Sequence, residues 1–276
     1  MGWMRMTHWI KIALFSCLMG VASFSFASYE AAVENYNKGN YFSAVKAFKK
    51  LAEAGDARAQ RVLGLLYIDG KRMDHDPEKA FEWLTHASDR DDVLARYFLG
   101  VLYSQGEGVR KKDKEAAEWW FYAAESNHPL AQSKLGLIHF QGKGVRRDYA
   151  KAAMWWKKAA EQGEVSAQRF LGLIYMTGKG VKRDDQQARR WLLAAAKQGD
   201  VMAQYNLGLM LAYGRGGSQD LTEAVNWLKK ASKSQGIKMS PFVKLGTSLH
   251  QEFSEVDKWY RKAAEQDAEL VLIRNR

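Results

Sequence analysis

The sequence of 276 residues is 47% hydrophobic and 26% charged, which is typical of a folded soluble protein and excludes an extensively disordered chain. Forty-two basic and 31 acidic residues give a formal net charge of +11, so the protein should attract anionic partners. Only three prolines are present, which favours uninterrupted helices.

Residues 1–27 are predicted to be a signal peptide. Arg5 and Lys11 supply positive charge, residues 12–26 are mostly apolar, and a small-x-small cleavage site ends at Ala27. A membrane anchor is the alternative, but about 20 continuous apolar residues are needed to span a bilayer, and serines interrupt this shorter run. We therefore expect cleavage after Ala27, no transmembrane segment in the mature chain, and a periplasmic or secreted protein.

Cys17 leaves a second possibility open, because residues 14–17 partly resemble the lipidation box of a bacterial lipoprotein. Phe15 is bulkier than that box usually allows, and an apolar stretch would remain beyond Cys17. The chain has one cysteine, and cleavage after Ala27 would remove it. Disulfides, thiol chemistry and cysteine-ligated metals are therefore excluded from the mature protein.

Residues 28–56 form a short segment that resembles a tetratricopeptide helix pair with a tight turn. The residues that carry this resemblance are Tyr36, Gly39, Tyr41, Ala44, Ala47 and Phe48. The terminal unit of a helical repeat protein must shield a stacking face from water. This pair is therefore expected to cap the N-terminal end of the repeats that follow it.

A repeat of 36 residues occupies most of the remaining chain. The dipeptide Leu-Gly recurs with its glycine at Gly64, Gly100, Gly136, Gly172 and Gly208, and a tryptophan follows each glycine by 19 residues. This period predicts five repeats, over residues 57–92, 93–128, 129–164, 165–200 and 201–234. A degenerate sixth repeat at residues 235–267 is expected to be the C-terminal cap, before a tail at residues 268–276.

Each repeat contains two amphipathic segments, such as residues 131–140 and 149–161, and both are predicted to be helices. The second segment has an apolar face at helical spacing, made of Ala152, Trp155, Trp156, Ala159 and Ala160. A glycine inside a helix costs about 1 kcal/mol relative to alanine. The Leu-Gly glycines are therefore predicted to allow close helix contact, and the recurring tryptophans are predicted to be packing residues.

Glycine-rich loops join the two helices of a repeat, as in residues 178–181, where glycine permits a positive φ. An aspartate then precedes the second helix and is predicted to cap its free amides, at Asp76, Asp148, Asp184 and Asp220. Gln187 and Glu223 lie three residues after their aspartates and are predicted to complete capping boxes.

The fourth repeat carries the most complete motif. It contains Ala167-Gln168, Leu171-Gly172, Tyr175, Gly178-x-Gly180-Val181, Asp184, Ala188, Trp191 and Ala195-Ala196. This pattern resembles the signature of Sel1-like repeats and extends over about residues 57–265. The resemblance implies an all-α αα-superhelix, a solenoid related to tetratricopeptide proteins, and a role as an adaptor in protein complexes.

No group of residues predicts catalysis, a metal site or a cofactor. The six histidines include no HExxH motif and no other pair at ligand spacing. A cysteine-rich secreted branch of the Sel1-like family is associated with β-lactam binding and hydrolysis, but its repeats each carry a disulfide that this chain lacks. We expect a protein that is not an enzyme, and a β-lactam hydrolase is the alternative from a different class.

Basic residues recur in three successive loops at the 36-residue period. They are Arg110, Lys111 and Lys112, then Arg146 and Arg147, then Lys182 and Arg183. Stacking of the repeats should align these loops into a positive edge whose field adds over several charges. The edge is a candidate surface for an anionic partner, and the alternative is that the loops are only solvated.

A second candidate surface is the concave side, which the first helix of each pair lines in related tetratricopeptide structures. The positions that vary between repeats are expected to contact a partner there, since a uniform surface cannot recognise a non-uniform partner. The selected residues are Arg61, Tyr97, Phe140, Arg169, Met176 and Tyr205, several of them types enriched at interaction hot spots.

The expected partner is a protein or peptide, acidic in character, or an anionic polymer of the cell envelope. Nucleic acid is not expected, because export removes the protein from it and no aromatic residues interleave with the basic loops. Related exported proteins also include regulators of signalling receptors and components of envelope machines, so a membrane-protein domain is an alternative partner. The sequence favours a scaffold in the cell envelope.

Overall fold

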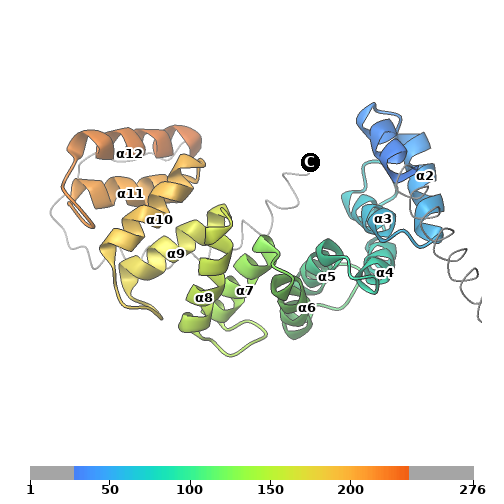
Figure 1. Ribbon diagram of the computed structural model, residues 1–276, viewed down its shortest axis with the longest axis horizontal. Coiled ribbons are helices and arrows are strands. Elements are labelled where there is room, and N and C mark those ends of the chain that lie inside the picture. The colour runs from blue at the N-terminus through green and yellow to red at the C-terminus, as the bar shows by residue number, and fades with distance from the viewer. Residues whose placement is uncertain (1–27, 236–276) are drawn as a thin grey trace, which may run out of the picture. The chain divides into compact units, whose positions relative to one another are not determined.

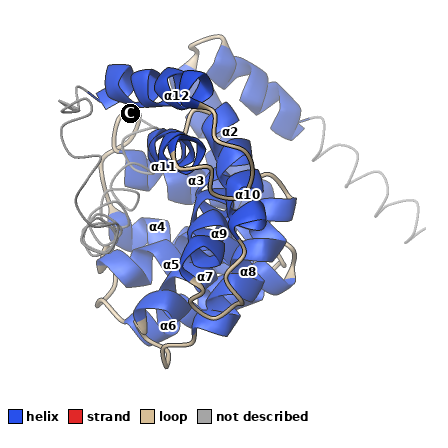
Figure 2. Ribbon diagram, turned by 90° about the vertical axis from the view of Figure 1, so that its left-hand side faces the viewer, coloured by secondary structure: helices blue, strands red, loops and turns tan. Residues whose placement is uncertain are grey.

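The computed structural model describes residues 28–235. Regular structure in this range is entirely helical, without strand (Figure 2), which confirms the prediction of an all-α chain. Two compact units divide the chain, one up to Lys111 and one from Lys112, and each is described by itself. The predicted signal peptide, residues 236–267 of the predicted sixth repeat and the C-terminal tail lie outside the described residues.

The N-terminal unit begins with a helical segment over residues 28–37. Its further helices are α2 (Tyr41–Glu53), α3 (Ala57–Asp69), α4 (Pro77–Ser88) and α5 (Val93–Gln105). Consecutive helices of this unit pack against one another, as the blue to green part of Figure 1 shows. The helix pair that precedes α3 therefore packs against the first repeat.

The C-terminal unit contains seven helices within the described residues. They are α6 (Asp113–Glu125), α7 (Pro129–Gln141), α8 (Tyr149–Glu161), α9 (Val165–Thr177), α10 (Asp185–Lys197), α11 (Val201–Ala212) and α12 (Leu221–Gln235). Odd-numbered helices from α3 on are the first helices of a repeat, and even-numbered helices from α4 on are the second. Of the helices among residues 28–235, none has the length and apolar character needed to cross a membrane.

The Leu-Gly glycines lie where the two helices of a repeat approach most closely. A Cβ atom on Gly172 would lie 2.7 Å from Leu192 Cγ, and one on Gly136 would lie 2.4 Å from Trp156 Nε1. Such distances leave no room for a side chain, so the structure confirms the predicted close contact. The residue directly after the recurring tryptophan faces the glycine in four repeats, at Gly64, Gly136, Gly172 and Gly208. Trp83, Trp191 and Trp227 pack at the edges of the core clusters, and Trp155 is itself buried.

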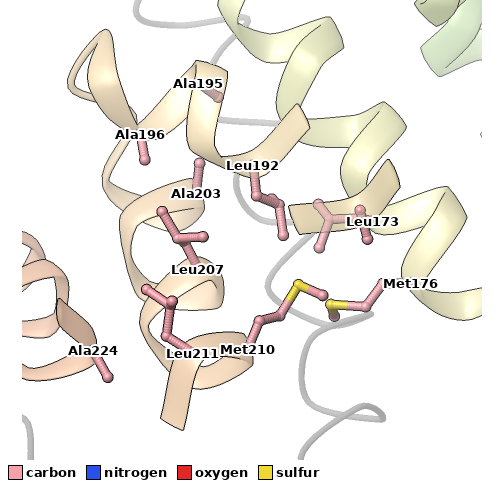
Figure 3. Packing of buried hydrophobic residues seen from close by; sticks show 11 residues of the cluster. Leu173, Met176, Leu192, Ala195, Ala196, Ala203, Leu207, Met210, Leu211 and Ala224 are labelled. Atoms are coloured by element: carbon pink, nitrogen blue, oxygen red, sulfur yellow. The ribbon is translucent and has the colours of Figure 1, made fainter. Parts of the chain in front are cut away.

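Small and large side chains alternate in the core between successive repeats. In the C-terminal unit, Leu173 and Met176 of α9 meet Leu192 of α10 and Leu207 and Met210 of α11 (Figure 3). Alanines of the second and first helices, among them Ala195, Ala196 and Ala203, are fully buried beside them. Close packing of this kind is the main source of stability in a chain without disulfides.

The predicted aspartate caps are present at the start of the second helices. The carboxylate of Asp184 accepts from the backbone N–H of Gln187 at 3.0 Å, and Asp76, Asp148 and Asp220 accept in the same way. The predicted return bond of the capping box is replaced. The backbone N–H of Asp184 donates instead to the carbonyl oxygen of Tyr175, nine residues earlier, and Glu223 accepts from Trp227 Nε1. Backbone hydrogen bonds thus close the loop.

A ladder of glutamines, in which buried Gln132 and Gln168 bond to exposed Gln162 and Gln198, joins the repeats and was not predicted from the sequence. The side-chain amide of Gln168 donates to the carbonyl oxygen of Ala160 at 3.2 Å, and its oxygen accepts from Gln198 at 2.8 Å. Gln132 makes the equivalent contacts one repeat earlier, with Ala124 and Gln162. These bonds satisfy polar groups that the packing removes from water.

The second glycine of each connecting loop contacts the preceding repeat. A Cβ atom on Gly180, at a φ of 76°, would lie 2.3 Å from the carbonyl carbon of Tyr149, in the first turn of α8. Gly144 faces Asp113 and Gly216 faces Asp185 in the same manner. In the second to fifth repeats the loop therefore rests on the first turn of the second helix of the repeat before it.

Gly180→Ala should destabilise the protein by about 2 kcal/mol or more, because a positive φ costs about 1 kcal/mol and the added Cβ collides with backbone. Gly163→Ala is the matched control: its φ is 87° and nothing lies within 4 Å of the added atom. Urea unfolding followed by circular dichroism should show a loss of only about 1 kcal/mol for the control. Equal losses would contradict the contact between loop and preceding repeat.

Candidate partner-binding surface

The basic loops of the third and fourth repeats lie next to each other. Arg146 and Arg147 precede Asp148, the N-cap residue of α8, and the loop that holds Lys179 and Gly180 rests on the first turn of α8. Lys182 and Arg183 follow in the same loop. Gly144, in the same loop as Arg146 and Arg147, contacts Asp113. Lys112 directly precedes Asp113 and therefore lies next to this loop.

We call Lys112, Arg146, Arg147, Lys182 and Arg183 the basic edge, and all five are exposed. Two of them have carboxylate neighbours: Lys112 pairs with Glu115 and Arg183 with Asp185, each at 2.9 Å. Asp148 and Asp184, which lie within the same segments, accept hydrogen bonds from the helix ends that they cap. The five positive charges of the basic edge therefore outnumber the two carboxylates that pair with them.

Arg110 and Lys111 are exposed as well, but they belong to the N-terminal unit. Within that unit Lys111 packs on the turn at Gly106, whose added Cβ would lie 3.0 Å from Lys111 Cβ. Of the first of the three predicted basic loops, only Lys112 therefore belongs to the C-terminal unit and to the basic edge.

Three of the residues selected on the first helices are buried. Tyr97 is 1% exposed, Arg169 3% and Met176 5%, and Met176 is part of the core between α9, α10 and α11 (Figure 3). The expectation that they lie on a contact surface is wrong. The exposed face of the first helices was inferred from related tetratricopeptide structures, and in this chain that choice includes residues of the core. A side chain enclosed by its own chain cannot meet a partner.

The arginines at these positions form ion pairs with the aspartate that ends their repeat. Arg169 of α9 pairs with Asp200 at 3.1 Å, and Arg61 of α3 pairs with Asp92 at 2.7 Å. Asp200 and Asp92 are the N-cap residues of the next first helix, α11 and α5. The ion pairs with these capping residues are a structural reason for the two arginines at this position.

Phe140 and Tyr205 remain partly exposed. Phe140, at the end of α7, lies 5.1 Å from Tyr149 and 5.6 Å from Trp156 between ring centroids. Cations flank this group: Lys179 Nζ lies 5.8 Å from the Phe140 ring, and the Arg147 guanidinium lies 5.6 Å from the Tyr149 ring. Phe140 is thus the one aromatic residue of the predicted set that adjoins the basic edge.

Exposed apolar residues on the second helices were missed by the sequence analysis. Phe121 is 46% exposed, Tyr122 55% and Met154 45%, and Phe121 lies 6.3 Å from Trp155 of the next second helix. The equivalent positions of the following repeat are Lys157 and Lys158. Comparison of repeats at the second helix, and not only at the first, would have found them.

A polar hollow of about 350 Å³ lies at the ends of α6 and α8, lined in part by Asn127, Gln132 and Gln162. These amides bond to one another: Gln162 donates to Gln132 at 2.8 Å and to Asn127 at 3.1 Å. The hollow is therefore part of the glutamine ladder.

Asp185 links the basic edge to the next repeat. It accepts from Arg183 and, at 2.7 Å, from Arg215 of the following loop. Burial tends to raise the pKa of Asp185, but the hydrogen bonds from the two arginines outweigh this effect and lower the pKa to about 2. The carboxylate is ionised at neutral pH and holds two loops together.

Arg169→Leu should lower the free energy of unfolding by about 3 kcal/mol, because it leaves the carboxylate of Asp200 without its buried partner. Adding Asp200→Asn, which can still cap α11 but carries no charge, should recover a large part of this loss. Urea unfolding of the single and double variants measures both values. Additive losses would show that the ion pair does not couple the repeats.

The stability that Asp185 contributes should depend on pH in a defined window. The ordinary pKa of an aspartate is about 3.9, so its folded-state value of about 2 means that the contribution is complete above pH 5 and disappears as the pH falls toward 2. The difference in unfolding free energy between the protein and its Asp185→Asn variant should follow this curve. A difference that does not change between pH 5 and 2 would contradict the ion pairs.

Comparison with known proteins gives the family. The Sel1 repeat model matches residues 57–92, 93–128, 129–164, 165–200, 201–235 and 258–267. The crystal structure of c5321, a protective antigen of uropathogenic Escherichia coli with an SLR fold, is similar, with a TM-score of 0.74, 32% identity and 90% of this chain covered. This chain spans 56% of the length of the E. coli chain.

A Sel1 repeat protein from Oxalobacter formigenes is similar as well, with a TM-score of 0.69 and 30% identity over 75% of this chain and 83% of its own. No curated protein matches the sequence. The helix pairs, the family match and these structures confirm the predicted solenoid fold. The chain belongs to the Sel1 repeat family, whose members are commonly scaffolds for protein–protein interaction and generally not enzymes.

Proposed function

We propose that this protein is an exported scaffold that binds an acidic protein or peptide through its basic edge. The observation that carries the proposal is the seating of each loop on the preceding repeat, which brings cations of successive repeats into one row. Charges held side by side act on a partner together, and they accelerate and orient its approach.

A protein partner fits the edge better than a uniform polymer does. The row is interrupted by carboxylates at Glu115 and Asp185, and it adjoins the aromatic group around Phe140. A surface that combines charge with an apolar contact discriminates between sequences, whereas a polyanion needs charge alone. Binding of an anionic envelope polymer in place of a protein would therefore count against the proposal.

The location follows from residues 1–27, which have the organisation of a signal peptide. Export and cleavage after Ala27 would place the scaffold in the periplasm or outside the cell. Its partners would then be envelope or extracellular proteins, including the exposed domain of a membrane protein. We assign no catalytic step, because the residues of the basic edge and of the Phe140 group include no nucleophile paired with a base.

The combined variant Arg146→Glu and Lys182→Glu should weaken partner binding by about tenfold or more, since it reverses two charges of the edge. A photo-crosslinking residue at position 147, introduced in intact cells of the source organism, identifies the partner. The affinity of the purified pair is then measured at low and high salt, and N-terminal sequencing of the exported chain tests the cleavage site.

Lys157→Glu with Lys197→Glu is the matched control, because both lysines are exposed on the second helices α8 and α10 and the change in charge is the same. This control should alter the affinity by less than about threefold. Equal effects of the two double variants, or crosslinks to polysaccharide alone, would overturn the proposal.

A further inference from the structure

An exposed apolar patch lies on α6 and α8, the second helices of the second and third repeats. Phe121 and Tyr122 of α6 and Met154 of α8 are each about half exposed, and we call these three residues the second-helix patch. Trp155 of α8 is buried and contacts both Phe121, at 6.3 Å between ring centroids, and Lys158 Nζ, at 4.4 Å from its ring. The patch therefore continues from one helix to the other. Exposed apolar side chains scattered singly are normal, whereas a cluster marks a contact site.

The residues of the second-helix patch depart from the repeat pattern. The equivalents of Met154 in the other four repeats are all polar: Glu82, Glu118, Arg190 and Asn226. Those of Phe121 and Tyr122 are Thr85 and His86, Lys157 and Lys158, Leu193 and Ala194, and Lys229 and Lys230. Leu193 and Ala194, the apolar pair among them, are partly buried. The fold thus accepts polar residues at these positions, and exposed apolar ones indicate a contact outside the chain.

The charged residues of the two exposed faces are distributed unequally. Within each helix one ion pair joins residues four positions apart, Lys114 with Glu118 on α6 and Lys157 with Glu161 on α8. The other exposed charges of these helices are Glu125 on α6 and Lys151 and Lys158 on α8. The α6 side of the patch is therefore negative and the α8 side is positive.

This distribution is complementary to itself. The C-terminal ends of α6 and α8 line the same polar hollow, so the two helices run in the same direction. A two-fold axis parallel to them would place α6 of one copy on α8 of another, so that Glu125 approaches Lys158 and the apolar residues meet between the helices. A perpendicular axis would place α8 on α8 and bring like charges together. Charge complementarity therefore selects the first arrangement.

We propose that the second-helix patch is a contact site for a second copy of this chain, in a two-fold dimer in which α6 of each copy packs on α8 of the other. The dimer does not depend on the proposed function. Helices α6 and α8 have 13 residues each, which span about 20 Å. A face two helices wide is small for a specific interface, so we expect a dissociation constant on the order of 10 µM.

The dimer would bring two basic edges together. Lys112 lies at the start of α6, and Arg146 and Arg147 precede the N-cap residue of α8. An axis parallel to the helices leaves the N-terminal ends of all four at one end of the dimer. A partner with two acidic segments could then contact both copies and bind with higher avidity than one copy provides.

Sedimentation velocity of the purified protein tests for the dimer. The average mass should rise from that of one chain to that of two as the concentration passes through the micromolar range. It should not exceed two chains, because a two-fold contact closes on itself. A single chain at concentrations well above the expected dissociation constant would overturn the proposal, and so would growth beyond two chains.

A pair of substitutions removes the apolar contacts. Tyr122→Lys takes its residue from the next repeat and Met154→Glu from the preceding one, so the fold should accept both. Together they should weaken the dimer by about tenfold or more. Leu94→Glu with Leu221→Lys is the matched control, because both leucines are exposed on other helices and the new charges are the same. The control should change the dissociation constant by less than about twofold, and equal effects would show that the patch is not the interface.

Charge reversal tests which helices meet. Glu125→Lys and Lys158→Glu should each weaken the dimer by about tenfold, since like charges would then face each other across the axis. Mixed in equal amounts, the two variants should associate with each other about as tightly as the unaltered protein does, because every such contact again joins a lysine and a glutamate. Effects within one chain cannot produce this recovery. A mixture that associates no more tightly than either variant alone would rule out the packing of α6 on α8.

Discussion

The close approach of the two helices of a repeat is the contact on which the packing within each compact unit depends. A glycine in the first helix admits the large side chain that follows the recurring tryptophan, at distances that exclude even a methyl group. The alanines of the second helix then bring the next first helix within reach, so that one packing solution is repeated along the chain. The loops, caps and glutamine ladder occupy positions that this spacing defines.

The repeat period made most of the fold predictable. Gly172 and its equivalents, the aspartate caps and the positive φ of the loop glycines follow from local rules that act within one repeat. The replacement of the capping-box return bond did not follow from those rules, because the competing acceptor, the carbonyl oxygen of Tyr175, is placed by the closed loop. The local sequence identifies the N–H donor at Asp184, whereas the closed loop determines which oxygen accepts its hydrogen bond.

The candidate surface was less predictable, because a residue that varies between repeats can serve either an internal contact or a partner. Arg169 and Arg61 differ from their equivalents because each pairs with the aspartate 31 residues later, which ends the same repeat and caps the first helix of the next one. Phe140 differs in a way that leaves its ring partly exposed beside cations. Variation matched by a second residue at a fixed distance indicates internal pairing, and unmatched variation is the better guide to a partner. This distinction could have been applied to the sequence.

The seating of each loop on the repeat before it gives the molecule a direction. Gly180 requires the first turn of α8, and Gly216 requires the first turn of α10, so the template for a repeat always lies on its N-terminal side. A chain that emerges from a ribosome or a translocation channel with its N-terminus first finds that template already folded. Each new repeat can then dock on the folded repeat before it. If the C-terminus emerged first, each repeat would lack its folded template until the preceding repeat had also emerged.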